Sequence, residues 1–181
     1  RSHCDWSSDV CSSDLGLGKL GAEVAKIGLA FQMEVIAWSE NLTAARAQDC
    51  GVRQVSKNDL LSLSDVLTIH LVLSARTRGL IGTEELQLMK SSAYLVNTSR
   101  GPIVDETALI DALTRKAIRG AALDGYDTEP LPSDHPIRKL DNAVLTGHTG
   151  YVIRDNFVHG YGEVVEDVLA WLAGKPLRLL N

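Results

Sequence analysis

The chain has 181 residues, of which 45% are hydrophobic and 23% are charged, and its net charge is −5; this composition is typical of a soluble globular domain with a substantial core. The acidic balance, without a Lys/Arg stripe, argues against a nucleic-acid partner, and no apolar run approaches the roughly 20 residues that span a bilayer. The three cysteines lack the spacing of a disulfide framework or a zinc site, so we expect a cytoplasmic protein without a metal.

The first fifteen residues differ from the rest of the chain. They contain five Ser and three Asp, with a near-repeat of SSDV and SSDL and no helical or strand period. The stretch resembles the in-frame translation of a sequencing-library adapter, and a natural polar tail is the alternative. We expect residues 1–15 to be a non-native leader and residues 16–181 to form one folded domain.

From residue 16 onward, strands and helices are predicted to alternate. The expected strands span residues 34–38, 52–55, 65–71, 93–97, 121–124 and 143–146. The expected helices span residues 21–30, 43–49, 84–89 and 156–173, with Ser56 capping a turn at 57–61, Thr83 capping the helix 84–89, and Asp105 opening a further helix. This alternation predicts an α/β fold, a Rossmann-type doubly wound parallel sheet with helices on both faces.

Gly16, Gly18 and Gly21 form a GxGxxG pattern at the start of the first predicted helix. In dinucleotide-binding folds the first glycine makes a tight turn, the second lets the pyrophosphate approach the backbone, and the third lets the helix pack closely. The helix and strand that follow favour dinucleotide binding over a plain glycine turn. Among residues 11–15, however, only Leu15 suits a buried strand, so we expect the first strand to be missing or degraded.

Ser39 and Glu40 follow the strand whose end normally presents an acidic residue to the adenosine ribose. Ser39 occupies the acidic position, and the adjacent carboxylate of Glu40 should repel a 2′-phosphate. No Arg occupies the next two positions to hold such a phosphate. The sequence therefore favours NAD as the cofactor, with NADP as the alternative if Glu40 points to solvent.

Five segments resemble the cofactor-binding domain of the D-2-hydroxyacid dehydrogenases. In chain order they are GLGKLG, DVLTIHLVLSARTRGLIG, LMKSSAYLVNTSRGPIVDETALIDAL, GAALDGYDTEPLP and LTGHTG. That family includes D-lactate, D-glycerate, phosphoglycerate, formate and phosphite dehydrogenases and the glyoxylate/hydroxypyruvate reductases. The resemblance implies an NAD(P)-dependent oxidoreductase that transfers a hydride between nicotinamide and the 2-carbon of a 2-hydroxy or 2-keto acid, in a homodimeric full-length protein.

The resemblance also implies the roles of individual residues. Arg100 would bind the substrate carboxylate and carbonyl, His148 would act as the general acid/base, and Glu129 would accept a hydrogen bond from the histidine. Asp124 would orient the nicotinamide carboxamide. The other expected cofactor contacts come from the glycine turn, the ribose strand and the flanking loops: Gly16, Gly18, Lys19, Leu20, Gly21, Ser39, Glu40, Thr77, Thr98 and Gly150. Taken singly, Arg100, Glu129 and His148 would more often be ordinary loop residues.

Three residues depart from the family pattern: Val72 and Gly147 stand where proline is usual, and Gly125 where valine is frequent. These changes bear on loop rigidity and leave the reacting groups in place. His70 is expected to be structural, or at most to line the cofactor cleft.

The family's second domain, which closes over the substrate, has no counterpart in the five segments. We therefore expect the chain to be a truncated fragment with negligible turnover on its own. Two alternatives stay open: a non-catalytic NAD-sensing module similar to the corepressors of the same family, and a fragment that does not fold independently. The sequence spacing suggests no interacting side chain for His135 or His159, so we expect both to lack a partner.

Overall fold

The computed structural model describes residues 10–179. The chain divides into two compact units, Arg1–Gly147 and His148–Asn181. Across residues 10–179, no helix combines the length and the apolar character that a membrane crossing requires.

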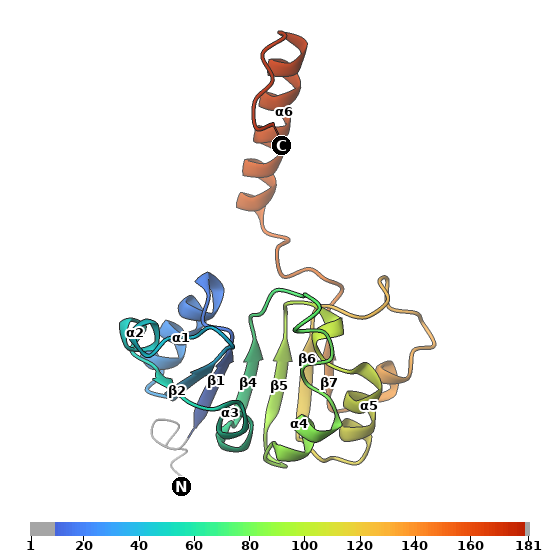
Figure 1. Ribbon diagram of the computed structural model, residues 1–181. Coiled ribbons are helices and arrows are strands. Elements are labelled where there is room, and N and C mark those ends of the chain that lie inside the picture. The colour runs from blue at the N-terminus through green and yellow to red at the C-terminus, as the bar shows by residue number, and fades with distance from the viewer. Residues whose placement is uncertain (1–9, 180–181) are drawn as a thin grey trace, which may run out of the picture. The chain divides into compact units, whose positions relative to one another are not determined.

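The first unit is built on a parallel sheet, which within the described residues has seven strands in the order β3-β2-β1-β4-β5-β6-β7 (Figure 1). The strands are β1 (Cys11–Leu15), β2 (Glu34–Trp38), β3 (Arg53–Gln54), β4 (Val66–Ile69), β5 (Tyr94–Asn97), β6 (Gly120–Leu123) and β7 (Ala143–Leu145). The strand order reverses between β1 and β4, and ligands of open α/β sheets bind outside the carboxyl ends of the strands at such a point. The predicted Rossmann-type fold is confirmed.

The helices begin close to the predicted positions. They are α1 (Lys19–Ala30), α2 (Ala44–Asp49), α3 (Lys57–Leu63), α4 (Thr83–Leu88), α5 (Glu106–Thr114) and α6 (Arg154–Leu172), with short 3₁₀ turns at Gly101–Ile103 and Pro136–Lys139. The side chains of Ser56 and Asp105 each accept a backbone N–H from the first turn of their helix. The predicted cap at Thr83 is wrong: the cap is Gly82, because the Glu85 carboxylate reaches back to accept the Gly82 N–H at 3.0 Å.

The two faces of the sheet have separate hydrophobic cores, as the alternation of side chains along β2 shows. Ile36 packs into the larger core with residues of α3, α4 and α5, which lie together on one face (Figure 1). Val35 and Ala37 point the other way and pack with Ala25 of α1 and Ala47 of α2. Helices therefore cover both faces at the β2 end of the sheet, which holds the carboxyl edge in place.

The first strand is formed, so the expectation that β1 would be missing or degraded is wrong. Cys11–Leu15 lies between β2 and β4 and is buried throughout. A parallel ladder uses backbone donors and acceptors only, and polar side chains therefore do not prevent pairing. The cost appears at Asp14, whose carboxylate is fully buried and lacks a hydrogen-bond partner among the described residues. Burial raises the pKa of Asp14 to about 7.

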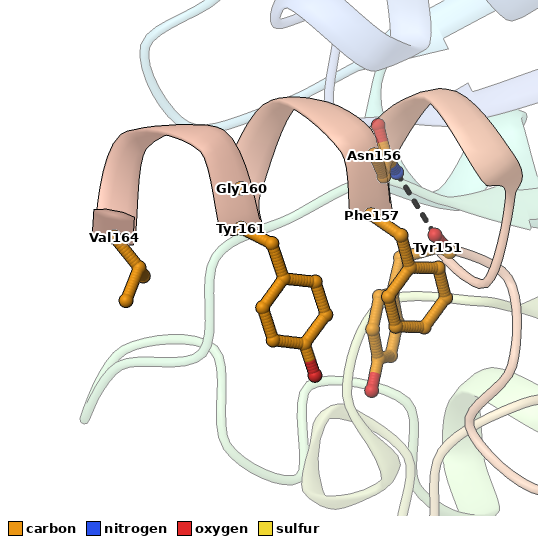
Figure 2. Close-up of a pocket in the computed structure, with 6 residues that line it drawn as sticks. All are labelled: Tyr151, Asn156, Phe157, Gly160, Tyr161 and Val164. Atoms are coloured by element: carbon orange, nitrogen blue, oxygen red, sulfur yellow. Dashed lines mark hydrogen bonds between the residues drawn. The ribbon is translucent and has the colours of Figure 1, made fainter. Parts of the chain in front are cut away.

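The second unit consists of the segment from His148 and the 19-residue helix α6, which was predicted to span 156–173. None of the helix residues is buried within the described chain. A shallow hollow in this unit lies among Tyr151, Phe157 and Tyr161 (Figure 2), where the Asn156 side chain donates to the Tyr151 carbonyl at 2.9 Å. The rings of Phe157 and Tyr161 stack with centroids 6.0 Å apart.

Candidate cofactor and active site

The glycine turn has the geometry that the sequence predicts. Gly16 has φ 106°, in the left-handed region, and a Cβ there would lie 3.0 Å from the His70 carbonyl oxygen. A Cβ on Gly21 would lie 2.1 Å from the carbonyl oxygen of Gly16. Only glycine fits at both positions, because a side chain at Gly16 would collide with the backbone after β4, and a side chain at Gly21 would push α1 away from the turn after β1.

The middle of this turn is open. A Cβ on Gly18 would meet no atom within 4 Å, and Gly18, Lys19 and Leu20 are all exposed. Gly18 is also the N-cap of α1, and no side chain of the described residues caps the backbone N–H groups there. An anionic group can therefore approach both the backbone and the positive end of the 12-residue helix. These features fit the diphosphate of a dinucleotide.

A cleft of about 630 Å³ lies beside this turn, at the carboxyl ends of β2 and β4. Trp38, Leu71 and Leu80 supply its apolar lining. Its polar lining is formed by Ser39, Glu40, Asn41, Ser74, Arg76 and Thr77. An apolar recess rimmed by hydroxyl, amide and charged groups suits an adenosine moiety. The ribose residues predicted from the sequence and Thr77 thus line one cleft, and Arg76 joins them without having been predicted.

The loop after β5 holds Arg100 by its backbone. The buried Asn97 side chain donates to the Arg100 carbonyl oxygen at 2.9 Å and accepts the Ser99 N–H at 3.0 Å. The Ser99 hydroxyl in turn donates to the Ile69 carbonyl oxygen at 2.7 Å. The Arg100 side chain is exposed, and its Nη1 donates to the Ser99 carbonyl oxygen at 2.7 Å. The backbone of Arg100 is therefore fixed, while its guanidinium stays accessible to a ligand.

The loops after β5 and β6 meet backbone to backbone. A Cβ on Gly101 would lie 2.3 Å from the carbonyl carbon of Tyr126. A Cβ on Gly125 would lie 3.5 Å from Glu129 Oε1 and 3.6 Å from the Arg100 Cα. Two catalytic candidates that are far apart in the sequence, Arg100 and Glu129, therefore lie beside the same glycine.

The carboxylates of the β6 loop are held by specific donors. Asp124 is buried, and its Oδ1 accepts the Thr146 hydroxyl at 2.5 Å. Glu129 is exposed, and its Oε1 accepts the Tyr126 N–H at 2.9 Å. The Tyr126 hydroxyl donates to the Thr146 carbonyl oxygen at 2.7 Å, and burial, with the nearby Asp124 charge, raises the pKa of Tyr126. Tyr126 and Thr146 thus brace this loop, a role that no local sequence pattern indicated.

His148 opens the second unit. It is half-buried, its backbone has φ 57°, and its ring meets that of Tyr151 edge to face with centroids 6.1 Å apart. Gln32, Lys116 and Arg178 also lie in the left-handed region, so this backbone conformation does not distinguish His148 from the rest of the described chain. The pairing of His148 with Glu129 stays a prediction, as do the cofactor contacts of Thr98 and Gly150, which are exposed.

Three other histidines, all within residues 10–179, have polar neighbours; His3 lies outside the described residues. His70 Nε2 lies 3.1 Å from the Thr68 hydroxyl, and burial lowers the pKa of His70. The expectation that His135 lacks a partner is wrong, because its Nε2 lies 3.0 Å from Glu106 Oε1 on α5. The same expectation is wrong for His159, because its Nε2 lies 3.5 Å from Glu163 Oε1 on the next turn of α6.

Comparison with known proteins agrees with this architecture. The family described as "D-isomer specific 2-hydroxyacid dehydrogenase, NAD binding domain" matches residues 14–150. The glyoxylate reductase of Aeropyrum pernix is 42% identical over 168 residues, covering 92% of this chain and 50% of that protein. A putative D-3-phosphoglycerate dehydrogenase from Ralstonia solanacearum superposes with a TM-score of 0.88 at 36% identity, over 93% of this chain and 49% of that one. An acyclic imino acid reductase in complex with NADPH and D-Arg superposes with a TM-score of 0.79 at 32% identity, over 98% of this chain and 56% of that one.

The chain belongs to the D-isomer specific 2-hydroxyacid dehydrogenase family and comprises its NAD-binding domain. It spans about half the length of the glyoxylate reductase that it matches. The resemblance that the five sequence segments indicated is confirmed.

Proposed function

We propose that this chain forms the cofactor-binding and catalytic domain of an NAD(P)-dependent enzyme that interconverts 2-hydroxy and 2-keto acids. The observation that supports this most directly is the convergence of Arg100 and Glu129 on Gly125, at the carboxyl edge of a sheet whose glycine turn fits a diphosphate. The exposed guanidinium that Arg100 carries at that edge suits a substrate that is itself a carboxylate.

Arg100 is proposed to bind the substrate. Its guanidinium is planar and permanently charged, so it can grip a carboxylate with two parallel hydrogen bonds and polarise the adjacent carbonyl. Asp124 is proposed to orient the carboxamide of the nicotinamide. NADH, when bound, supplies the hydride.

His148 is proposed as the acid/base. It would donate a proton to the carbonyl oxygen of the keto acid during reduction and take the hydroxyl proton during oxidation. Glu129 would accept a hydrogen bond from the other ring nitrogen, which fixes the tautomer.

The test separates cofactor binding from turnover. NADH fluorescence titration of the 181-residue chain measures binding, and the Gly18→Val variant should abolish it by filling the open approach to the turn. Turnover is measured in a chimera in which residues 16–181 replace the matching half of the Aeropyrum pernix glyoxylate reductase, assayed with glyoxylate, hydroxypyruvate and pyruvate.

In that chimera, His148→Gln and Arg100→Gln should each lower kcat/KM by at least about 100-fold, since each removes a group on which the transition state depends. Arg115→Gln, a change at the exposed residue that follows α5, is the matched control and should leave kcat/KM unchanged. If the folded chimera binds NADH but shows no turnover, the proposed enzymatic function is rejected in favour of a non-catalytic NAD-sensing module.

Two further properties are proposed from the sequence. Cys11 and Cys50 are free thiols in the structure, which agrees with a reducing compartment such as the cytoplasm. A homodimeric state of the full-length protein is proposed from the family resemblance, and light scattering of the chimera tests it.

A further inference from the structure

Arg76 is a cation in the adenosine cleft for which the proposed chemistry has no use. It lies on the loop after β4, far from β2 in the sequence, yet it lines the same cleft as Ser39 and Glu40. Its side chain is exposed, and no hydrogen bond or ion pair with another described residue engages it. An unpaired guanidinium at the rim of a nucleoside cleft is available to a ligand anion.

We propose that Arg76 binds the 2′-phosphate of NADPH, so that this domain accepts NADPH as well as NADH. The inference deepens the proposed function and rests on its cofactor cleft. In dinucleotide-binding folds a nearby arginine accommodates the 2′-phosphate, whereas an acidic residue at the end of the second strand selects the 2′-hydroxyl.

The loop that carries Arg76 is pre-organised. The Thr77 hydroxyl accepts the Ser74 N–H at 2.8 Å and donates to the Val72 carbonyl oxygen at 2.8 Å. The Arg78 N–H also donates to the Ser74 carbonyl oxygen at 3.0 Å, which closes the turn around Arg76. Because this backbone is already ordered, a phosphate that binds Arg76 has to immobilise only the side chain.

The opposite side of the cleft tolerates a phosphate. Ser39 occupies the position at the end of β2 where an acidic residue would select NAD. Its half-buried hydroxyl can donate to a phosphate as readily as to a ribose. Glu40 opposes the phosphate charge, but it is exposed, so water screens it and it can turn away. The exposed guanidinium of Arg76 is the one cation among the residues that line the cleft, and it is free to face the phosphate.

The experiment measures binding rather than turnover. NADH and NADPH are titrated by fluorescence, and 5′-AMP and 2′,5′-ADP, which differ only in the 2′-phosphate, are titrated by calorimetry. Arg76→Ala should weaken NADPH and 2′,5′-ADP by about 10- to 100-fold, the range of a charge-assisted hydrogen bond, and change NADH and 5′-AMP less than about 3-fold. Arg78→Ala, on the same loop but outside the cleft lining, is the matched control and should change none of them.

Glu40→Gln is a second variant, and it should have the opposite effect on NADPH binding. Because it removes the negative charge that opposes the phosphate, it should increase the affinity for NADPH by about 3- to 10-fold. The inference is overturned if wild-type protein binds NADH but not NADPH, or if Arg76→Ala affects both cofactors equally or neither. In those cases the proposed function stands. Failure of the folded chain to bind either cofactor would reject both.

Discussion

Replacing Asp14 by asparagine should remove most of the pH dependence of stability between pH 5 and pH 8. The carboxylate is fully buried in the central strand without a hydrogen-bond partner among the described residues, and burial raises its pKa from 3.8 to about 7. The unfolded chain loses this proton near pH 3.8 and the folded chain near pH 7. Between these values the folded state binds more protons, so stability falls as pH rises.

The size of the effect follows from the shift of Asp14. A displacement from 3.8 to about 7 corresponds to about 4 kcal/mol at 1.36 kcal/mol per unit, and the portion between pH 5 and pH 7 is about 3 kcal/mol. Above pH 7 both states are ionised and the penalty is constant. With a urea m-value of about 2 kcal/mol/M, the wild-type midpoint should fall by about 1.5 M from pH 5 to pH 8 relative to the variant.

Urea unfolding at pH 5, 6, 7 and 8 tests this, with the difference between wild type and Asp14→Asn as the readout. The difference is needed because a second buried group, His70, lies close by, with its Nε2 3.9 Å from Asp14. Burial lowers the pKa of His70, so its contribution to the free energy of unfolding rises with pH, whereas that of Asp14 falls. Asp141→Asn, at an exposed carboxylate, is the control and should follow wild type. Parallel wild-type and Asp14→Asn profiles would refute the reasoning.

Three other predictions follow from the loops. Gly21→Ala should destabilise the domain by at least about 2 kcal/mol in urea unfolding, since its Cβ would lie 2.1 Å from a backbone oxygen, whereas Gly18→Ala should unfold like wild type because that position is open; equal midpoints would contradict this. Asn97→Ala should cost about 1–3 kcal/mol by leaving buried backbone groups of the Arg100 loop unpaired, and should raise KM more than it lowers kcat in the chimera; an unchanged KM argues against the positioning role. The 181-residue chain alone should bind NADH without oxidising it when 2-keto acids are added, and steady turnover in a spectrophotometric assay would disprove that.

Local patterns predicted the elements well where hydrophobic periodicity and capping residues act over a few residues. The strand at Glu34–Trp38 is reproduced in full, and Ser56 and Asp105 cap helices as expected. The segment after Ser56 was expected to be only a turn, but it forms α3 because Leu60 and Leu61 are buried against the sheet. The first strand was misjudged for a related reason: its composition opposes burial, yet its neighbours β2 and β4 supply a ladder on each side.

The candidate site also has features that the sequence predicted and features that only the folded sheet creates. The glycine spacing indicated the dinucleotide turn, and the five segments indicated the family. The resemblance to that family, and not the residues taken singly, implied the roles of Arg100 and Glu129. The presence of Arg76 in the adenosine cleft, the clamp that Asn97 places on Arg100, and the meeting of Gly101 with Tyr126 depend on parallel strands that end at one edge. Residues far apart in the chain become neighbours there only after the sheet has assembled. The sequence by itself therefore determined which chemical groups this protein carries, and the tertiary structure decided which of them share a cleft.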